Sequence, residues 1–143
     1  MRRTAIVVAI FFLGGLLLIY TQRTSVVGTF QAAGPDIGQW MMTADECQSG
    51  EHQGFFGIVL FSSKDRKLGI RIVQPPSPSI MANVPGENDA HVFEADSCTI
   101  LKVDLHRANR KFNGIWDVYG SVAVDCQAQN AHLQGRAELS HCH

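Results

Sequence analysis

The sequence lacks an excess of positive charge in the part expected to fold as a domain. From Gly34 onward, nine Lys and Arg residues stand against thirteen Asp and Glu, which leaves a surplus of four negative charges. Nucleic-acid-binding domains ordinarily present a basic face, and a polybasic contact with anionic lipid needs a cluster of cations. The composition therefore argues against a nucleic-acid partner and against a polybasic grip on lipid.

Catalytic motifs are also scarce. The chain contains no Gly-x-Ser-x-Gly elbow, which would present a serine nucleophile in an α/β-hydrolase. It contains no Cys-x-x-Cys pair either, so neither a thioredoxin-type redox motif nor a zinc ribbon is indicated. We expect a protein that is not an enzyme and binds no cofactor.

Cysteine is sparse, but its count and placement are informative. An even number of cysteines in a small exported domain indicates disulfides and an oxidising compartment. Two bridges would leave no cysteine free to act as a nucleophile. The four cysteines all follow the N-terminal region, and they are Cys47, Cys98, Cys126 and Cys142.

One long apolar run, residues 5–20, dominates the N-terminal region, with Arg2 and Arg3 before it and Arg23 after it. As a helix it would extend about 24 Å, slightly short of a hydrocarbon core of about 30 Å. It also exceeds the 7–15 or so residues common in the apolar part of a signal peptide. Residues 1–22 are therefore a signal anchor or a signal peptide. The excess of arginine before the run favours a single-pass protein with its N-terminus in the cytoplasm and its domain outside, periplasmic or extracellular.

A cleaved leader, and hence a secreted protein, is the alternative. Signal peptidases need small residues at positions −3 and −1, and no clean Ala-x-Ala follows the run. The nearest candidate is Gln31-Ala32-Ala33, which lies far downstream and has a poor residue at −3. We therefore favour an uncleaved anchor that contacts the membrane through residues 5–20.

The rest of the chain has the pattern of short β-strands. Residues 23–38 are expected to form a tether broken at Gly34-Pro35, and residues 39–143 a single domain. Residues 43–47 are expected to form a turn. Short alternating segments separated by turns predict an all-β fold of seven to eight strands, an antiparallel β-sandwich or small barrel. The expected strands are residues 39–43, 55–62, 69–74, 79–84, 91–94, 99–106, 115–126 and 132–142.

The strand order predicts the disulfide pairing. If residues 115–126 and 132–142 pair across a turn near Asn130, Cys126 and Cys142 lie at opposite ends of the hairpin. Ten residues of strand then separate them by roughly 30 Å, whereas a disulfide needs Cα atoms within about 7 Å. A preceding hairpin centred near Arg110 brings Cys98 to Cys126. This leaves Cys47 to pair with Cys142, and each bridge should stabilise the fold by about 2–4 kcal/mol.

Basic residues gather in two expected loops. If both loops lie at one end of the sandwich, they form a rim suited to an anionic partner; the alternative is that turns are charged because they are solvated. Trp116, at the start of a strand, is a candidate for partial exposure and hence for contact with a partner. The loop residues are Lys64, Arg66, Lys67, Arg107, Arg110 and Lys111.

The C-terminal histidines are a weak candidate for metal binding. His141 and His143 are two residues apart, so in a strand they would face the same side and a third ligand would come from elsewhere, such as His132, His106 or His52. Cys142 between them is better explained by a disulfide, and terminal residues are commonly exposed. We therefore expect no metal here.

Three functions remain open. The leading hypothesis is a non-catalytic module on the outer side of a membrane, which contacts a protein or the envelope through loops at residues 107–113 and 75–78. The second is a small-ligand carrier with a β-barrel cavity, and the third is a metal-binding domain that uses the C-terminal histidines.

Overall fold

The computed structural model describes residues 24–143 apart from residues 75 and 87. The expected leader, residues 1–22 with the apolar run 5–20, lies outside the described part. Within that part, no helix is long and apolar enough to cross a membrane.

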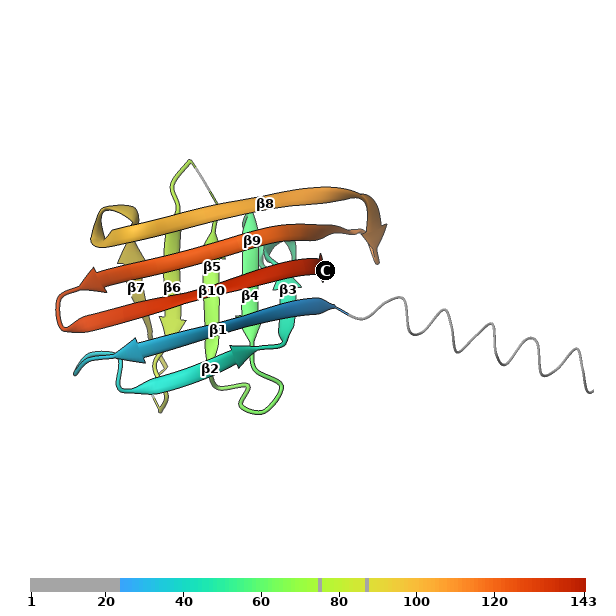
Figure 1. Ribbon diagram of the computed structural model, residues 1–143. Coiled ribbons are helices and arrows are strands. Elements are labelled where there is room, and N and C mark those ends of the chain that lie inside the picture. The colour runs from blue at the N-terminus through green and yellow to red at the C-terminus, as the bar shows by residue number, and fades with distance from the viewer. Residues whose placement is uncertain (1–23, 75, 87) are drawn as a thin grey trace, which may run out of the picture.

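Two antiparallel sheets of five strands each form the described fold, so the predicted all-β antiparallel architecture is confirmed. One sheet, sheet A, has the order β2-β1-β10-β9-β8, and the other, sheet B, has the order β3-β4-β5-β6-β7. Figure 1 shows the sheets as two layers whose strands cross. The strands are β1 Ser25–Ala33, β2 Trp40–Ala44, β3 Glu46–Ser49, β4 Gly57–Phe61, β5 Gly69–Val73, β6 Ser79–Asn83, β7 Ala90–Glu94, β8 Cys98–Phe112, β9 Ile115–Ala128 and β10 Ala131–Cys142; the 3-10 helices are η1 Gly50–Gln53 and η2 Ala95–Ser97.

The first strand corrects the sequence-based expectation, because it lies in the segment expected to be a tether. In β1, buried and exposed residues alternate over all nine positions. Two of the inward positions are Gly28 and Ala32, whose small side chains weaken the apolar signal. A Cβ on Gly28 would lie 2.5 Å from that of Ala137, so the packing against β10 requires glycine there.

The third strand is a second correction. Residues 43–47 do not turn; the chain passes through Asp45 from β2 in sheet A directly into β3 in sheet B. The Asp45 carboxylate accepts hydrogen bonds from the backbone N–H and the hydroxyl of Ser63, which tie this corner to the segment after β4. With β1 and β3 added, the described chain has ten strands rather than seven or eight.

The core lies between the two sheets and is built from the inward residues of the alternating strands. Both sheets contribute fully buried large side chains, so the layers interdigitate. The largest of them are Phe30, Phe93, Ile37, Met42, Ile58, Leu60, Ile70, Ile72, Ile80 and Leu133.

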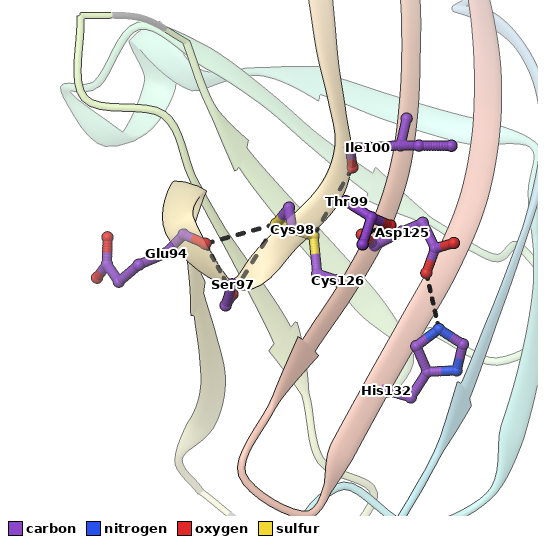
Figure 2. The surroundings of a disulfide bond; sticks show 8 residues. All are labelled: Glu94, Ser97, Cys98, Thr99, Ile100, Asp125, Cys126 and His132. Atoms are coloured by element: carbon purple, nitrogen blue, oxygen red, sulfur yellow. Dashed lines mark hydrogen bonds and ion pairs between the residues drawn. A yellow bond between two sulfur atoms is a disulfide. The ribbon is translucent and has the colours of Figure 1, made fainter.

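Two disulfides close the domain in the predicted pairing. Cys47 of β3 bonds Cys142 of β10 and so joins the two sheets. Cys98 bonds Cys126 where β8 begins beside β9, and Figure 2 shows this bridge next to the Asp125–His132 contact.

The β8–β9 hairpin is longer than predicted. Residues 107–112 belong to β8 rather than to a loop, and the chain turns at Asn113-Gly114 instead of near Arg110. Both turn residues have positive φ, 49° and 85°, a conformation that Asn-Gly adopts readily in two-residue hairpin turns. The pairing of the two strands shifts register between Arg107 and Lys111. Cys98 nevertheless lies opposite Cys126, as predicted.

Candidate functional site

The tip of the β8–β9 hairpin lies at the end of the sandwich where the described chain begins and ends. Ser25 of β1 pairs with His141 of β10, and Cys142 pairs with Val118 of β9. Figure 1 shows the hairpin tip, the start of β1 and the C-terminus on the same side of the molecule. We define the tip cluster as the side chains that meet here: Glu51, Phe56, Arg107, Arg110, Lys111, Phe112, Trp116, Asp117, His141 and His143.

Asp117 is the buried centre of the tip cluster, with only 1% of its surface exposed. Its Oδ2 accepts a hydrogen bond from Nε of Arg110 at 2.6 Å and lies 3.1 Å from Nδ1 of His141. Its Oδ1 accepts the backbone N–H of Cys142 at 3.0 Å. The Arg110 guanidinium also contacts the His141 ring. One carboxylate therefore ties together β8, β9 and the end of β10.

These partners determine the charge state of Asp117. Burial alone would raise the pKa of this carboxyl, because a charged form is poorly solvated in the interior. Hydrogen bonds from Arg110, His141 and the Cys142 backbone outweigh burial, so the pKa lies below the ordinary 3.8. Asp117 is therefore an anion at neutral pH and is paired with a cation.

Both terminal histidines lie near this carboxylate, but only His141 belongs to strand β10. β10 ends at Cys142, and His143 stacks on Phe112 with ring centroids 4.1 Å apart. Its Nδ1 lies 3.9 Å from Oδ1 of Asp117. In residues 24–143 as described, no group of three or more His, Cys, Asp or Glu side chains is placed to hold a metal ion. The positive charge beside Asp117 comes from the Arg110 guanidinium.

Glu51 fastens the tip to sheet B. This residue belongs to η1, which follows β3, and Ser49 caps the helix with its hydroxyl. Oε1 of Glu51 accepts a hydrogen bond from Arg107 at 2.6 Å, and Oε2 accepts the backbone N–H of Trp116 at 3.1 Å. The carboxylate therefore braces both strands of the hairpin where it extends past the other strands.

Three cations of the tip lie over aromatic rings. The Arg107 guanidinium carbon is 4.7 Å from the centroid of Phe56, which is 43% exposed. Arg110 lies 5.1 Å from the ring of Phe112, and Lys111 lies 4.5 Å from that of Trp116. Arg107, Arg110 and Lys111 are all exposed, and Trp116 is half-buried. The structure thus brings together the four residues expected to contact a partner: Arg107, Arg110, Lys111 and Trp116.

The second basic loop lies near this end but carries balanced charge. Arg66 pairs with Glu46 at 2.7 Å and lines an open hollow of about 520 Å³ together with Thr24 and His143. Lys64, Arg66 and Lys67 are accompanied by the carboxylates of Asp45, Glu46 and Asp65. The surplus of positive charge therefore belongs to the hairpin tip. Of the other expected contact loop, residues 75–78, residue 75 lies outside the described residues.

The hollow between the sheets next to the tip is too small for a ligand. The hollow that Glu51, Phe56, Leu105 and Val118 help to line holds about 10 Å³, about the volume of one water-sized probe. A larger hollow of about 380 Å³ lies over the outer face of sheet A, beside Thr29 and Arg136. A carrier would need an internal cavity of several hundred Å³, so the described core does not favour this hypothesis.

Comparison with family models, curated proteins and solved structures finds no match for this chain. The site is therefore interpreted from its own geometry. Sequence reasoning missed Glu51 and Phe56, because their partners are distant in the chain. It missed the central role of Asp117 because Arg110 was expected in a loop and not in the paired strand. One signal was available for Asp117: a carboxylate between Trp116 and Val118, in an otherwise apolar strand start.

Proposed function

We propose that this protein is a non-catalytic binding module, anchored to a membrane by residues 5–20 and displayed on its outer side, and that the tip cluster binds an anionic partner. The carrying observation is the gathering of three exposed cations and their aromatic rings at one end of the domain. Arg and Trp side chains held by rigid strands are typical of binding surfaces.

The buried ion pair supports a fixed surface rather than a set of loose side chains. Arg110 is held by Asp117, and Arg107 is held by Glu51. Lys and Arg ordinarily lose much rotamer freedom when they bind a partner. Two of the three cations have therefore been ordered in advance.

The first strand supports an anchor over a cleaved leader. The nearest candidate cleavage site, Gln31-Ala32-Ala33, lies inside β1, which pairs with both β2 and β10. Cleavage after Ala33 would remove an inner strand together with the fully buried Phe30. Upstream of β1, residues 21–24 contain no Ala-x-Ala.

A photo-crosslinking amino acid at position 111 of the full chain, in native membranes, tests the binding surface. The matched control is position 102, an exposed lysine on the same strand. We expect an adduct, with protein or with lipid, from position 111 and none from position 102. Equal adducts from both positions, or none from position 111, would rule out the tip as the binding surface. Recovery of the whole chain in the soluble fraction would rule out the anchor.

A further inference from the structure

The chain outside the described residues arrives at the same end of the domain as the tip cluster. Ser25, the first residue of β1, pairs with His141, whose ring contacts Arg110 and Asp117. Thr24 lines the same hollow as His143. The apolar run therefore joins the domain beside the basic end and not at the opposite end.

Chain length limits how far this end can lie from the apolar run. From residue 20, where the run ends, to Ser25 there are five residues, which span at most about 18 Å. The hairpin continues past the Cys142–Val118 pair to Asn113, five residues farther along β9 and its turn, or about 17 Å. The hairpin projects by about the same length as the longest possible connection, about 17 Å against about 18 Å. The tip can therefore reach the membrane surface at which the apolar run ends.

The distribution of charge favours the same orientation. The tip carries three cations, Arg107, Arg110 and Lys111, against two carboxylates, Glu51 and Asp117, each paired with an arginine, so its formal net charge is +1. The opposite end, around the Cys98–Cys126 bridge and the β1–β2 and β9–β10 connections, contains no Lys or Arg in residues 34–39, 94–99 and 125–132. The acidic residues there are Asp36, Glu94, Asp96 and Asp125.

The side chains of the tip are of the kinds that contact lipid headgroups. Trp side chains concentrate at membrane–water interfaces, and Lys and Arg extend their charged groups toward phosphate while their stems cover apolar surface. With a formal net charge of +1, the tip attracts an anionic surface only weakly. Attachment through a short connection raises the local concentration of that surface, so a strong cationic patch is unnecessary, and the acidic composition of the whole domain does not oppose the contact.

We infer that the tip cluster rests on the headgroups of the anionic bilayer that holds residues 5–20, so that the domain stands on the membrane with its acidic end outward. The inference rests on the proposed membrane anchor. The anionic partner of the proposed function is then the lipid surface.

The two tryptophans provide the test, because Trp40 lies near the far end and Trp116 at the tip. Trp40 pairs with Ala32, one position before the Ala33–His132 pair beside the β9–β10 turn. The full chain is reconstituted in nanodiscs of phosphatidylcholine with phosphatidylglycerol and with lipid that carries a nitroxide quencher at the headgroup. The variants Trp40→Phe and Trp116→Phe report each tryptophan separately.

We expect Trp116 to be quenched at least several-fold more than Trp40. Its quenching should fall when phosphatidylglycerol is omitted or when salt is raised to about 1 M, where the screening length is about 3 Å. Lys111→Glu should reduce it, whereas Lys102→Glu, the same charge change on the same strand, should not. If a tryptophan variant does not fold, the two lysine variants give the comparison in the otherwise native chain.

The two levels of the proposal fail differently. A chain that does not enter nanodiscs of either composition would overturn the anchor, and the inference with it. A chain that enters them but shows Trp116 quenched no more than Trp40, or quenched without regard to lipid charge, would overturn this inference alone. The tip would then be left for a protein partner.

Discussion

Asp117 shows how one buried carboxylate organises the exposed residues around it. Its oxygens receive hydrogen bonds from Arg110 and the Cys142 backbone and contact His141. A buried charge without partners is strongly destabilising, and hydrogen bonds to charged groups are stronger than neutral ones. The position of Arg110 at the surface therefore depends on a residue that no partner would touch.

Asp117→Asn should destabilise the domain by about 2–3 kcal/mol, because the amide keeps an acceptor for Cys142 but loses the ion pair with Arg110. Urea unfolding of the purified chain measures the change. Asp104→Asn is the control, since Asp104 is exposed on the same hairpin and should change the unfolding free energy by less than about 0.5 kcal/mol. Equal effects of the two substitutions would show that Asp117 has no special role.

Acidification should weaken the domain through the same carboxylate. Because the pKa of Asp117 is lower in the folded state than the ordinary 3.8, its stabilisation is present above pH 3.8 and is lost as the pH falls through the lower folded value. Unfolding free energy measured from pH 6 down to about pH 2 should decline less in Asp117→Asn than in the native chain. A smaller decline should remain, because hydrogen bonds from Ser63 also lower the pKa of Asp45. Parallel pH profiles would contradict this account.

At the scale of elements, the long β8–β9 hairpin and the two disulfides set the position of the tip. The Cys47–Cys142 bridge closes a separation of 95 residues and holds β10 beside β3, next to the Asp117 site. The Cys98–Cys126 bridge closes 28 residues at the opposite end of the hairpin. The Cys98–Cys126 bridge therefore links the two hairpin strands covalently at the end away from the tip, whereas the tip end is held only indirectly, through β10.

The loop-closure model predicts that the two bridges contribute unequally. Replacing Cys47 and Cys142 together with alanine should lower the unfolding free energy by about 4–5 kcal/mol, and replacing Cys98 and Cys126 together by about 3–4 kcal/mol. Removing both partners avoids a free thiol that could exchange. Urea unfolding of the two double variants gives the order directly. The reverse order would mean that native-state packing around the bridges, rather than loop length, determines their effect.

The elements that sequence predicts well are those with a strong period and clear ends. Alternation and the β9–β10 turn were sufficient to place the last two strands and to pair the cysteines. β1 was missed because Gly28 and Ala32 occupy inward positions, where contact with β10 demands small residues. β3 was missed because residues 43–47 were expected to turn, whereas Asp45 accepts a hydrogen bond from Ser63, 18 residues away, and the chain continues into the second sheet.

At the scale of the whole molecule, the positions of the charges indicate which end could contact an anionic surface, and the net charge does not. Net acidity argues against a polybasic grip on lipid. It does not show that the cations of the hairpin gather at the end where the chain enters and that the far end is acidic. Composition alone cannot reveal this polarity, because it depends on which loops the topology brings together. The sequence predicted Arg107, Arg110, Lys111 and Trp116 as contact residues, which stays a prediction. It did not indicate that Asp117 holds Arg110 or that Glu51 holds Arg107 and the backbone of Trp116.

The intact mass of the chain isolated from membranes, before and after reduction, tests most directly whether the leader remains attached to an oxidised domain. We predict a mass that includes the apolar run, residues 5–20, with all four cysteines blocked to alkylation until a reductant is added. A mature chain that begins near Ser25 or later, or cysteines that react without reductant, would contradict a disulfide-closed domain held at the membrane by its own N-terminal segment.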